Sequence, residues 1–116
     1  MDEMRQVLHK MMDACALRHS VIAHNLANAE TQGYRRQDVV FRDALAAAIE
    51  SGDRGAIADV QPRIETDFDS PVDADGNNVS AQRELGRMAQ NNLLYELSAR
   101  VLSGKFATLR KAIKGR

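Results

Sequence analysis

The sequence predicts an all-α protein in which two long terminal helices form a coiled-coil-like pair, joined by a shorter helix and a partly irregular middle segment. Three observations predict this fold: heptad spacing near the C-terminus, an amphipathic stretch near the N-terminus, and glycine and proline punctuation between them. At 116 residues the chain has the length of one domain. We therefore interpret residues 1–30, 31–79 and 80–116 as parts of a single domain.

The amphipathic pattern of residues 1–30 predicts a helix from about Glu3 to Ala29. Apolar residues recur there at three-, four- or seven-residue spacing: Met4, Leu8, Met11, Cys15 and Ile22. We interpret Cys15 as a small buried hydrophobic residue, because no neighbouring base would activate its thiol. The stretch lacks the basic and apolar regions of a secretory signal, so we expect no cleaved signal peptide.

Residues 31–79 predict a turn, a short helix and an irregular segment. The short helix is the amphipathic stretch from Val39 to Glu50, which the sequence SGDRG then breaks with two glycines. From there to Asn78 no hydrophobic period holds, and Pro62, Pro71 and Asp75-Gly76 interrupt the chain. We therefore expect partial order in this segment.

Residues 80–116 predict a heptad helix, with Ser80 as its N-cap and Glu84 in its first turn. Residues at strict three- and four-residue spacing form the predicted helix seam: Leu85, Met88, Asn92, Tyr95, Ala99, Leu102, Phe106, Leu109 and Ile113. A seam held over four repeats indicates coiled-coil packing. Asn92 is its one polar member, and we expect this side chain to set register.

The charged residues are unevenly distributed, although the formal net charge is zero. Six acidic residues and one Arg63 lie between Asp59 and Asp75, and every charged residue after Glu96 is basic. One interpretation is a solvated acidic loop and a helix C-terminus whose cations suit the helix dipole. The other is a pair of complementary patches that set how neighbouring copies dock.

The sequence contains no pattern that indicates catalysis or cofactor binding. His9, His19 and His24 are not spaced three or four apart, so no two share a helix face as metal ligands would. An alignment of the acidic run to a calcium loop puts Pro71 at the first ligand position and Gln82 where a glutamate belongs. We expect no catalytic, cofactor-binding or metal site, no small-molecule substrate and no enzymatic activity.

Residues 24–34 form a polar motif that helix packing alone does not explain. Asn25 and Asn28 stand three residues apart in an apolar stretch, and Gly33 can adopt the left-handed conformation that follows many helices. We interpret the pair of asparagines as a face that hydrogen-bonds to another group.

Two motifs resemble the flagellar axial proteins. Asn25, Leu26, Ala27, Asn28, Thr31, Gly33 and Tyr34 are similar to the N-terminal motif of that family. Asp75-Gly76-Asn77-Asn78-Val79, followed by Asn91-Asn92, Tyr95 and Ser103-Gly104-Lys105-Phe106, resembles the proximal members of the flagellar basal-body rod protein family. Gln32 departs from the family, which usually has proline there. The resemblance covers residues 15–45 and 74–114.

The resemblance implies a structural subunit of the bacterial flagellar basal-body rod that assembles through its terminal helices and is needed for flagellum-dependent motility. It implies a periplasm-spanning location, reached through the flagellar type III export apparatus. The implied partners are other copies of the chain, other rod and basal-body proteins, and the export apparatus.

Two rival functions follow from the residues themselves. A small helical adaptor or export chaperone would bind one partner through the C-terminal seam, but it would leave the motif at residues 25–34 unexplained. A nucleic-acid-binding helix would use the basic C-terminus, but no aromatic stacking residues are interleaved with those charges. We therefore expect no nucleic-acid partner.

Overall fold

The computed structural model of the chain describes residues 2–114, with side chains for residues 3–53, 55–104 and 111. Along the described chain the elements are α1 (Asp2–Ala27), β1 (Gln37–Val40), α2 (Arg42–Glu50), α3 (Arg54–Asp59), β2 (Arg63–Thr66) and α4 (Ala81–Lys114). The predicted long terminal helices are both present, and they contact each other.

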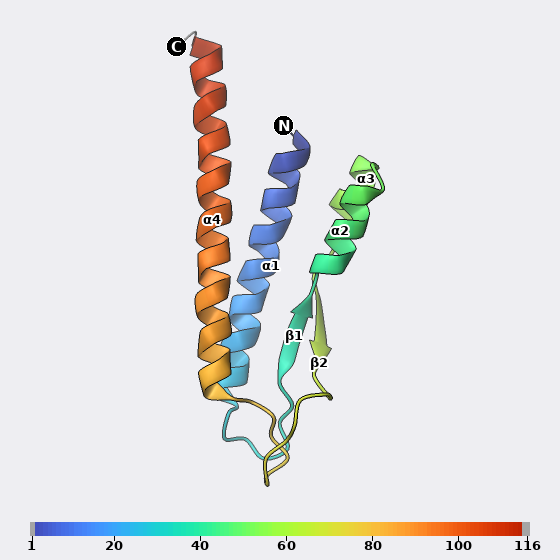
Figure 1. The fold of residues 1–116 in the computed structure, drawn as a ribbon, viewed down its shortest axis with the longest axis vertical. Coiled ribbons are helices and arrows are strands. Elements are labelled where there is room, and N and C mark those ends of the chain that lie inside the picture. Colours follow the sequence, from blue (N-terminus) through green and yellow to red (C-terminus); the bar gives the residue numbers. More distant parts are fainter. Residues whose placement is uncertain (1, 115–116) are drawn as a thin grey trace.

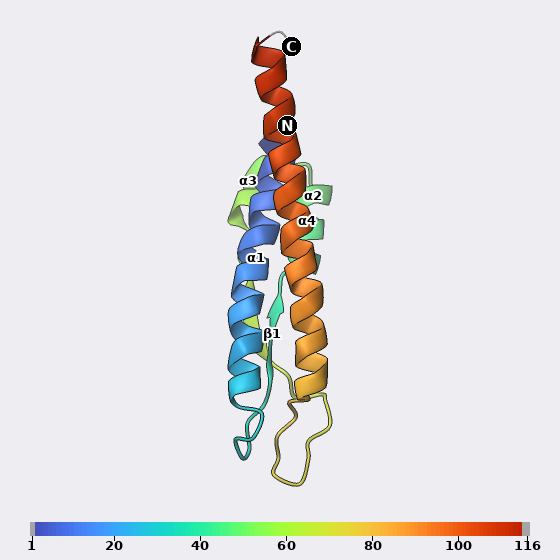
Figure 2. The same ribbon diagram turned by 90° about the vertical axis from the view of Figure 1, so that its left-hand side faces the viewer.

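The elements lie side by side in a flattened and elongated molecule. α1 occupies the middle, with α4 antiparallel to it on one side and the β1–β2 sheet, α2 and α3 on the other (Figure 1). The principal-axis extents are 64 × 28 × 14 Å. α4 continues past the N-terminal end of α1, and irregular connections close the opposite end of the molecule (Figures 1 and 2).

The main hydrophobic core lies between α1 and the smaller elements. α1 contributes Ala14 and Val21, and the residues opposite are Val39, Phe41, Leu45, Ala48, Ile57 and Val60. These residues come from β1, α2, α3 and the residues that flank them. Of the predicted apolar side of the stretch from Val39 to Glu50, Phe41 and Leu45 are thus buried, whereas Val40 is half-buried and Ile49 is exposed.

The prediction of an all-α chain is wrong in the middle segment, which contains a small sheet. β1 pairs antiparallel with β2, in a register that runs from Gln37 opposite Thr66 to Val40 opposite Arg63. The short helix was predicted to begin at Val39, but α2 begins at Arg42. Consecutive β-branched and aromatic residues favour extended backbone, and periodicity over four residues does not separate a strand from a helix.

Residues 52–78, which we expected to be only partly ordered, contain α3 and β2. The Asp53 carboxylate accepts a hydrogen bond from the Gly55 backbone N–H at 2.9 Å and thereby caps α3. All four residues of β2 are exposed, so this strand has no apolar face that its sequence could have indicated.

The ends of the two long helices lie close to their predicted positions. α1 ends at Ala27, two residues before the predicted Ala29, and its last turn continues as tight turns. Gly33 has a φ of +74°, which confirms the left-handed conformation, although it lies six residues beyond α1. α4 begins after Ser80, whose hydroxyl oxygen accepts the Arg83 backbone N–H at 3.3 Å.

Within the described chain, no helix combines the length and apolar character needed to cross a membrane.

Candidate functional site

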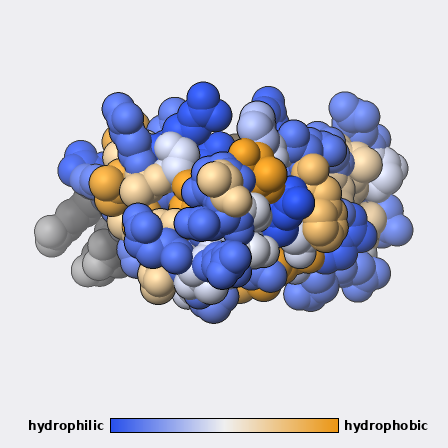
Figure 3. All heavy atoms as spheres, turned by 90° about the horizontal axis from the view of Figure 1, so that it is seen from below, coloured by the Kyte–Doolittle hydropathy of each residue, from blue (hydrophilic) through white to orange (hydrophobic). Residues whose placement is uncertain are grey.

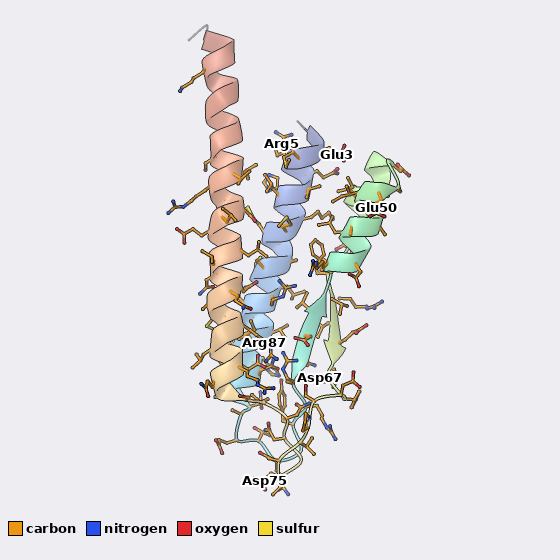
Figure 4. The ribbon with its side chains drawn as sticks, in the orientation of Figure 1. Glu3, Arg5, Glu50, Asp67, Asp75 and Arg87 are labelled. Atoms are coloured by element: carbon orange, nitrogen blue, oxygen red, sulfur yellow. The ribbon has the colours of Figure 1, made fainter. Side chains whose placement is uncertain are left out.

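A cluster of polar side chains joins the end of α1, the start of β1 and the start of α4. We call it the polar clasp, and it consists of Asn25, Tyr34, Arg36, Asp38, Asp67 and Glu84. Asp67 and the nearby Arg87 both lie at this end of the molecule, between α4 and the sheet (Figure 4). The clasp therefore ties the two terminal helices to the middle segment.

Glu84 and Arg36 form the buried centre of the clasp. The Glu84 side chain is fully buried and that of Arg36 is 3% exposed. Arg36 Nε donates to Glu84 Oε1 at 2.6 Å, and Arg87 Nη1 donates to the same oxygen at 2.7 Å. Two cations thus compensate one buried carboxylate, as a buried charge requires.

Arg36 also bonds two further carboxylates. Its Nη1 and Nη2 donate to the two oxygens of Asp38 at 2.7 Å each, and Nη1 donates to Asp67 Oδ2 at 3.1 Å. The hydrogen bonds to Asp38, followed by those to Glu84 and Asp67, raise the pKa of the guanidinium despite its burial. Arg36 is therefore a permanent cation that holds carboxylates from the hairpin and from α4.

The amide of Asn25 is fully buried, and its donors and acceptor are all used. Nδ2 donates to the Gln37 carbonyl at 2.9 Å and to Glu84 Oε2 at 3.2 Å. Oδ1 accepts the Tyr34 hydroxyl and the Gln37 backbone N–H, each at 2.9 Å. Asn25 is thus a fixed connector between α1, β1 and α4, which explains why the sequence has an asparagine in an otherwise apolar stretch.

The two motifs that carried the resemblance meet in space. Asn77 Nδ2 donates to the carbonyl oxygens of Asn28 and Thr31 at 2.9 and 2.8 Å. The Gly33 backbone N–H donates to the Asp75 carbonyl at 2.8 Å. The motif at residues 75–79 therefore hydrogen-bonds to the backbone of the motif at residues 25–34. The sequence alone did not indicate that the two motifs are in contact.

The other motif residues have local or peripheral positions. Asn28 Nδ2 donates to the His24 carbonyl of its own helix at 2.9 Å. The Asn28 side chain is therefore not a second buried connector beside Asn25. Leu26 is half-buried, and Ala27 is exposed.

The predicted helix seam does not lie as a whole against α1. Met88 and Ala99 are half-buried and Leu102 is buried, whereas Leu85, Asn92 and Tyr95 are exposed. The side chains of Phe106, Leu109 and Ile113 lie outside the described residues. Asn91, not Asn92, is the buried amide of α4: it is 4% exposed, and its Nδ2 donates to the Cys15 carbonyl of α1 at 2.8 Å.

The buried positions of α4 are shifted by one residue from part of the predicted seam. Glu84, Asn91 and Ser98 are buried at seven-residue spacing, and Leu8, Cys15 and Ile22 are buried at the same spacing on α1, where Asn91 bonds the Cys15 carbonyl. A pattern based on apolar residues selected Leu85, Asn92 and Ala99 instead. The buried positions of α4 could have been found from another signal: polar residues at seven-residue spacing, which need hydrogen-bond partners when they are buried.

Apolar residues, of which only Leu85 belonged to the predicted seam, form an exposed row on α4. Leu85, Ala89, Leu93, Leu97 and Val101 follow one another at four-residue spacing, and all are exposed. We call this row the α4 ridge. Leu93 is 67% exposed and Leu97 is 56% exposed, so the ridge faces away from α1. Such a row is the element by which helices pack into neighbouring grooves.

The geometry offers no metal or thiol chemistry in the described part of the chain. No group of three or more His, Cys, Asp or Glu residues could hold a metal ion there. Burial raises the pKa of the Cys15 thiol, which keeps it protonated and unreactive. The clasp carboxylates are occupied by Arg36 and Arg87.

No family model matches the chain, but comparison with known proteins finds relatives that are similar over most of its length. The chain is 30% identical to the flagellar basal body rod protein FlgB of Borrelia hermsii, over 91% of this chain and 92% of that protein. It is 32% identical to FlgB of Aquifex aeolicus, over 85% of this chain and 83% of the relative. It is 32% identical to FlgB of Escherichia coli, over 78% of each. Over nearly its whole length, then, the chain belongs to the flagellar basal body rod protein FlgB family.

Proposed function

We propose that this chain enters the flagellar rod with α1 and α4 as one preassembled unit, and that the α4 ridge contacts neighbouring subunits. As a member of the FlgB family, the chain is a structural subunit of the flagellar basal-body rod and not an enzyme. Its family also associates it with other rod proteins.

The observation that carries the proposal is the exposure of the α4 ridge. Leu85, Leu93 and Leu97 are 56%, 67% and 56% exposed, and Val101 is 39% exposed. Full burial of one such side chain contributes about 1.5–3 kcal/mol, and a monomer rarely leaves a contiguous apolar row bare without an interaction site. A neighbouring subunit on this row would recover that free energy.

In this proposal the polar clasp positions the ridge. Asn25, Arg36 and Glu84 fix the end of α1 against the start of α4, and Asn91 fixes the helices two turns further on. The motif at residues 25–34 thus acts within the subunit, by holding α4 at a set angle and register. The α4 ridge acts between subunits.

The test is a single charge on the ridge. We expect Leu97→Asp to fold normally, because Leu97 is exposed in the free chain, but to be missing from basal bodies isolated from cells that lack their own copy. The matched control is Asn92→Asp, which adds the same charge to an exposed position of α4 outside the ridge. Entry of Leu97→Asp into rods at the control's level would reject the ridge as an interface.

We further propose that the chain reaches a periplasm-spanning rod through the flagellar type III export apparatus, and that its partners there are copies of itself and other rod and basal-body proteins. The proposal rests on family membership. An epitope-tagged chain should appear outside the cytoplasm only in cells with a working apparatus. Equal export from cells without that apparatus would contradict this route.

A further inference from the structure

The two ends of the molecule carry opposite charge. The last part of α4 projects beyond α1 at one end, and the connection between β2 and α4 forms the other end (Figure 1). Positions 103–114, in the last part of α4, include four basic residues and no acidic residue: Lys105, Arg110, Lys111 and Lys114. Lys111 is exposed.

The opposite end is acidic. Residues 64–82 include five acidic residues and no basic residue, and Asp75 lies at the tip (Figure 4). Asp69, Asp73 and Asp75 are exposed, and none of them forms an ion pair among the described residues. Asp67, by contrast, is ion-paired with Arg36 of the clasp, and the Arg35 guanidinium lies over the Phe68 ring.

Apolar residues accompany the charges at both ends. At the acidic end Phe68 is 73% exposed and Val72 is 42% exposed. Seen from this end, the surface is mainly hydrophilic with separate hydrophobic patches (Figure 3). In the sequence of the basic end, Phe106, Leu109 and Ile113 continue the spacing of Leu102.

We propose that a second copy of this chain docks end to end, so that the basic projecting part of α4 in one copy contacts the acidic connection between β2 and α4, residues 67–80, in the next. This inference rests on the proposed function, and it adds a longitudinal contact that is distinct from the α4 ridge. The two patches lie at opposite ends of one chain, so the contact is heterologous and leaves a free patch of each kind for further copies. Opposite charges speed such docking and fix its register, and apolar contacts supply the affinity.

The competing explanation is local. Basic residues at a helix C-terminus stabilise their own helix, and an acidic loop is simply well solvated. The local explanation makes each patch independent of the other. The end-to-end contact makes them depend on each other, so charge reversal at one end should be corrected by charge reversal at the other.

The experiment therefore uses two reversed chains and their combination. The acid-reversed variant is Asp69→Lys with Asp75→Lys, whose side chains make no described hydrogen bond that holds the loop. The base-reversed variant is Arg110→Glu with Lys111→Glu. A matched control, Asp13→Lys with Glu50→Lys, makes the same charge change at exposed positions of α1 and α2.

Each full-length chain is produced in cells that lack their own copy, and its amount in isolated basal bodies is measured together with swimming. We expect rod incorporation of each reversed variant to fall by about tenfold or more. Incorporation of the chain with all four substitutions should recover to within about threefold of the unmodified chain. The control should match the unmodified chain. Circular dichroism of each purified variant establishes that it is folded.

Two outcomes would overturn the end-to-end contact: normal incorporation of both reversed variants, or loss in both without recovery in the combination. Neither outcome would affect the proposed function, because the unmodified chain would still enter rods. The proposed ridge contact is tested separately, by the incorporation of Leu97→Asp against Asn92→Asp. Failure of the end-to-end contact can therefore be distinguished from failure of the proposed function.

Discussion

At the scale of single residues, Arg36 is the cation that holds three carboxylates of the clasp together. Its guanidinium bonds Asp38 in β1, Asp67 after β2 and Glu84 in α4. We expect Arg36→Met to lower the free energy of unfolding by about 3–5 kcal/mol, because it leaves Glu84 buried with only one cation. Urea unfolding followed by circular dichroism measures the loss.

The control for this prediction is Arg63→Met. Arg63 forms an ion pair of similar length with Glu65, at 2.7 Å, but the two side chains are 73% and 51% exposed. Solvent screens an exposed pair, so we expect a change of about 1 kcal/mol or less. Equal losses in the two variants would show that burial of the clasp does not decide its contribution.

The lowered pKa of Asp67 predicts how the stability of the fold depends on pH. Hydrogen bonds from the Ser70 hydroxyl, from backbone N–H groups of Ser70 and Asp69, and from Arg36 hold the pKa of Asp67 below its usual range. A carboxylate with a lowered pKa stabilises the fold above its unfolded pKa of about 3.9, and this contribution is lost as the pH falls below that value. Asp67→Asn should therefore flatten the decline of stability between about pH 4 and pH 2, whereas Asp69→Asn should not.

At the scale of elements, the sequence predicted the length and ends of α1 and α4 well because both helices have strong hydrophobic spacing and α4 has a serine cap. The phase of α4 was shifted by one residue at part of the predicted seam because Glu84 and Asn91 are buried with hydrogen-bond partners, and a search for apolar residues does not select them. β2 could not be predicted, since it has four exposed residues and its partner strand lies more than twenty residues earlier.

The shifted phase makes a direct prediction about two adjacent asparagines. Asn91→Ala removes a buried hydrogen bond to α1 and should lower the free energy of unfolding by about 1–2 kcal/mol. Asn92→Ala, at an exposed position of the same helix, should change it by less than about 0.5 kcal/mol. If the two losses were reversed, the phase of α4 against α1 would be the one that apolar spacing suggested.

Two glycines give a matched contrast between turn and helix. A Cβ at Gly33 would meet nothing within 4 Å, so the cost of Gly33→Val is the left-handed backbone at φ +74°, about 1–2 kcal/mol. Gly33→Asn should cost less, because asparagine tolerates this conformation. A Cβ at Gly86 also meets nothing, but Gly86 lies inside α4, so Gly86→Ala should stabilise by up to about 1 kcal/mol. Urea unfolding of the three variants compares them, and a loss in Gly86→Ala would contradict this account.

At the scale of the whole molecule, the α4 ridge predicts the behaviour of the free chain. Leu93→Gln with Leu97→Gln should leave the urea midpoint nearly unchanged and should keep the chain monomeric at higher concentration, since both side chains are exposed. Sedimentation equilibrium measures this. Leu8→Gln with Val21→Gln, at buried positions, is the control and should unfold the chain. A large drop in midpoint for the ridge variant would mean that the ridge packs within the chain.

Most of the polar clasp could not be predicted from the sequence, because its contacts depend on the arrangement of the whole molecule. Asn25 and Tyr34 belonged to a recognisable motif, but Arg36, Asp67 and Glu84 acquire their roles only when the connections bring three distant segments together. A charged residue in a loop or in the first turn of a helix is ordinarily solvated. Only the burial of Glu84 and Arg36 distinguishes them, and burial is a property of the assembled chain.

The hydrogen bonds between α1 and α4 also set the order of events during synthesis. Asn25 bonds Glu84, 59 positions later, and Asn91 bonds Cys15 across 76 positions. A nascent chain on a ribosome can form α1 and the hairpin early, but α1 lacks its long partner until residue 84 of 116 has emerged. Contacts so distant in sequence also slow the search for the native state. The subunit therefore spends most of its synthesis unfinished, and its last third decides when folding is complete.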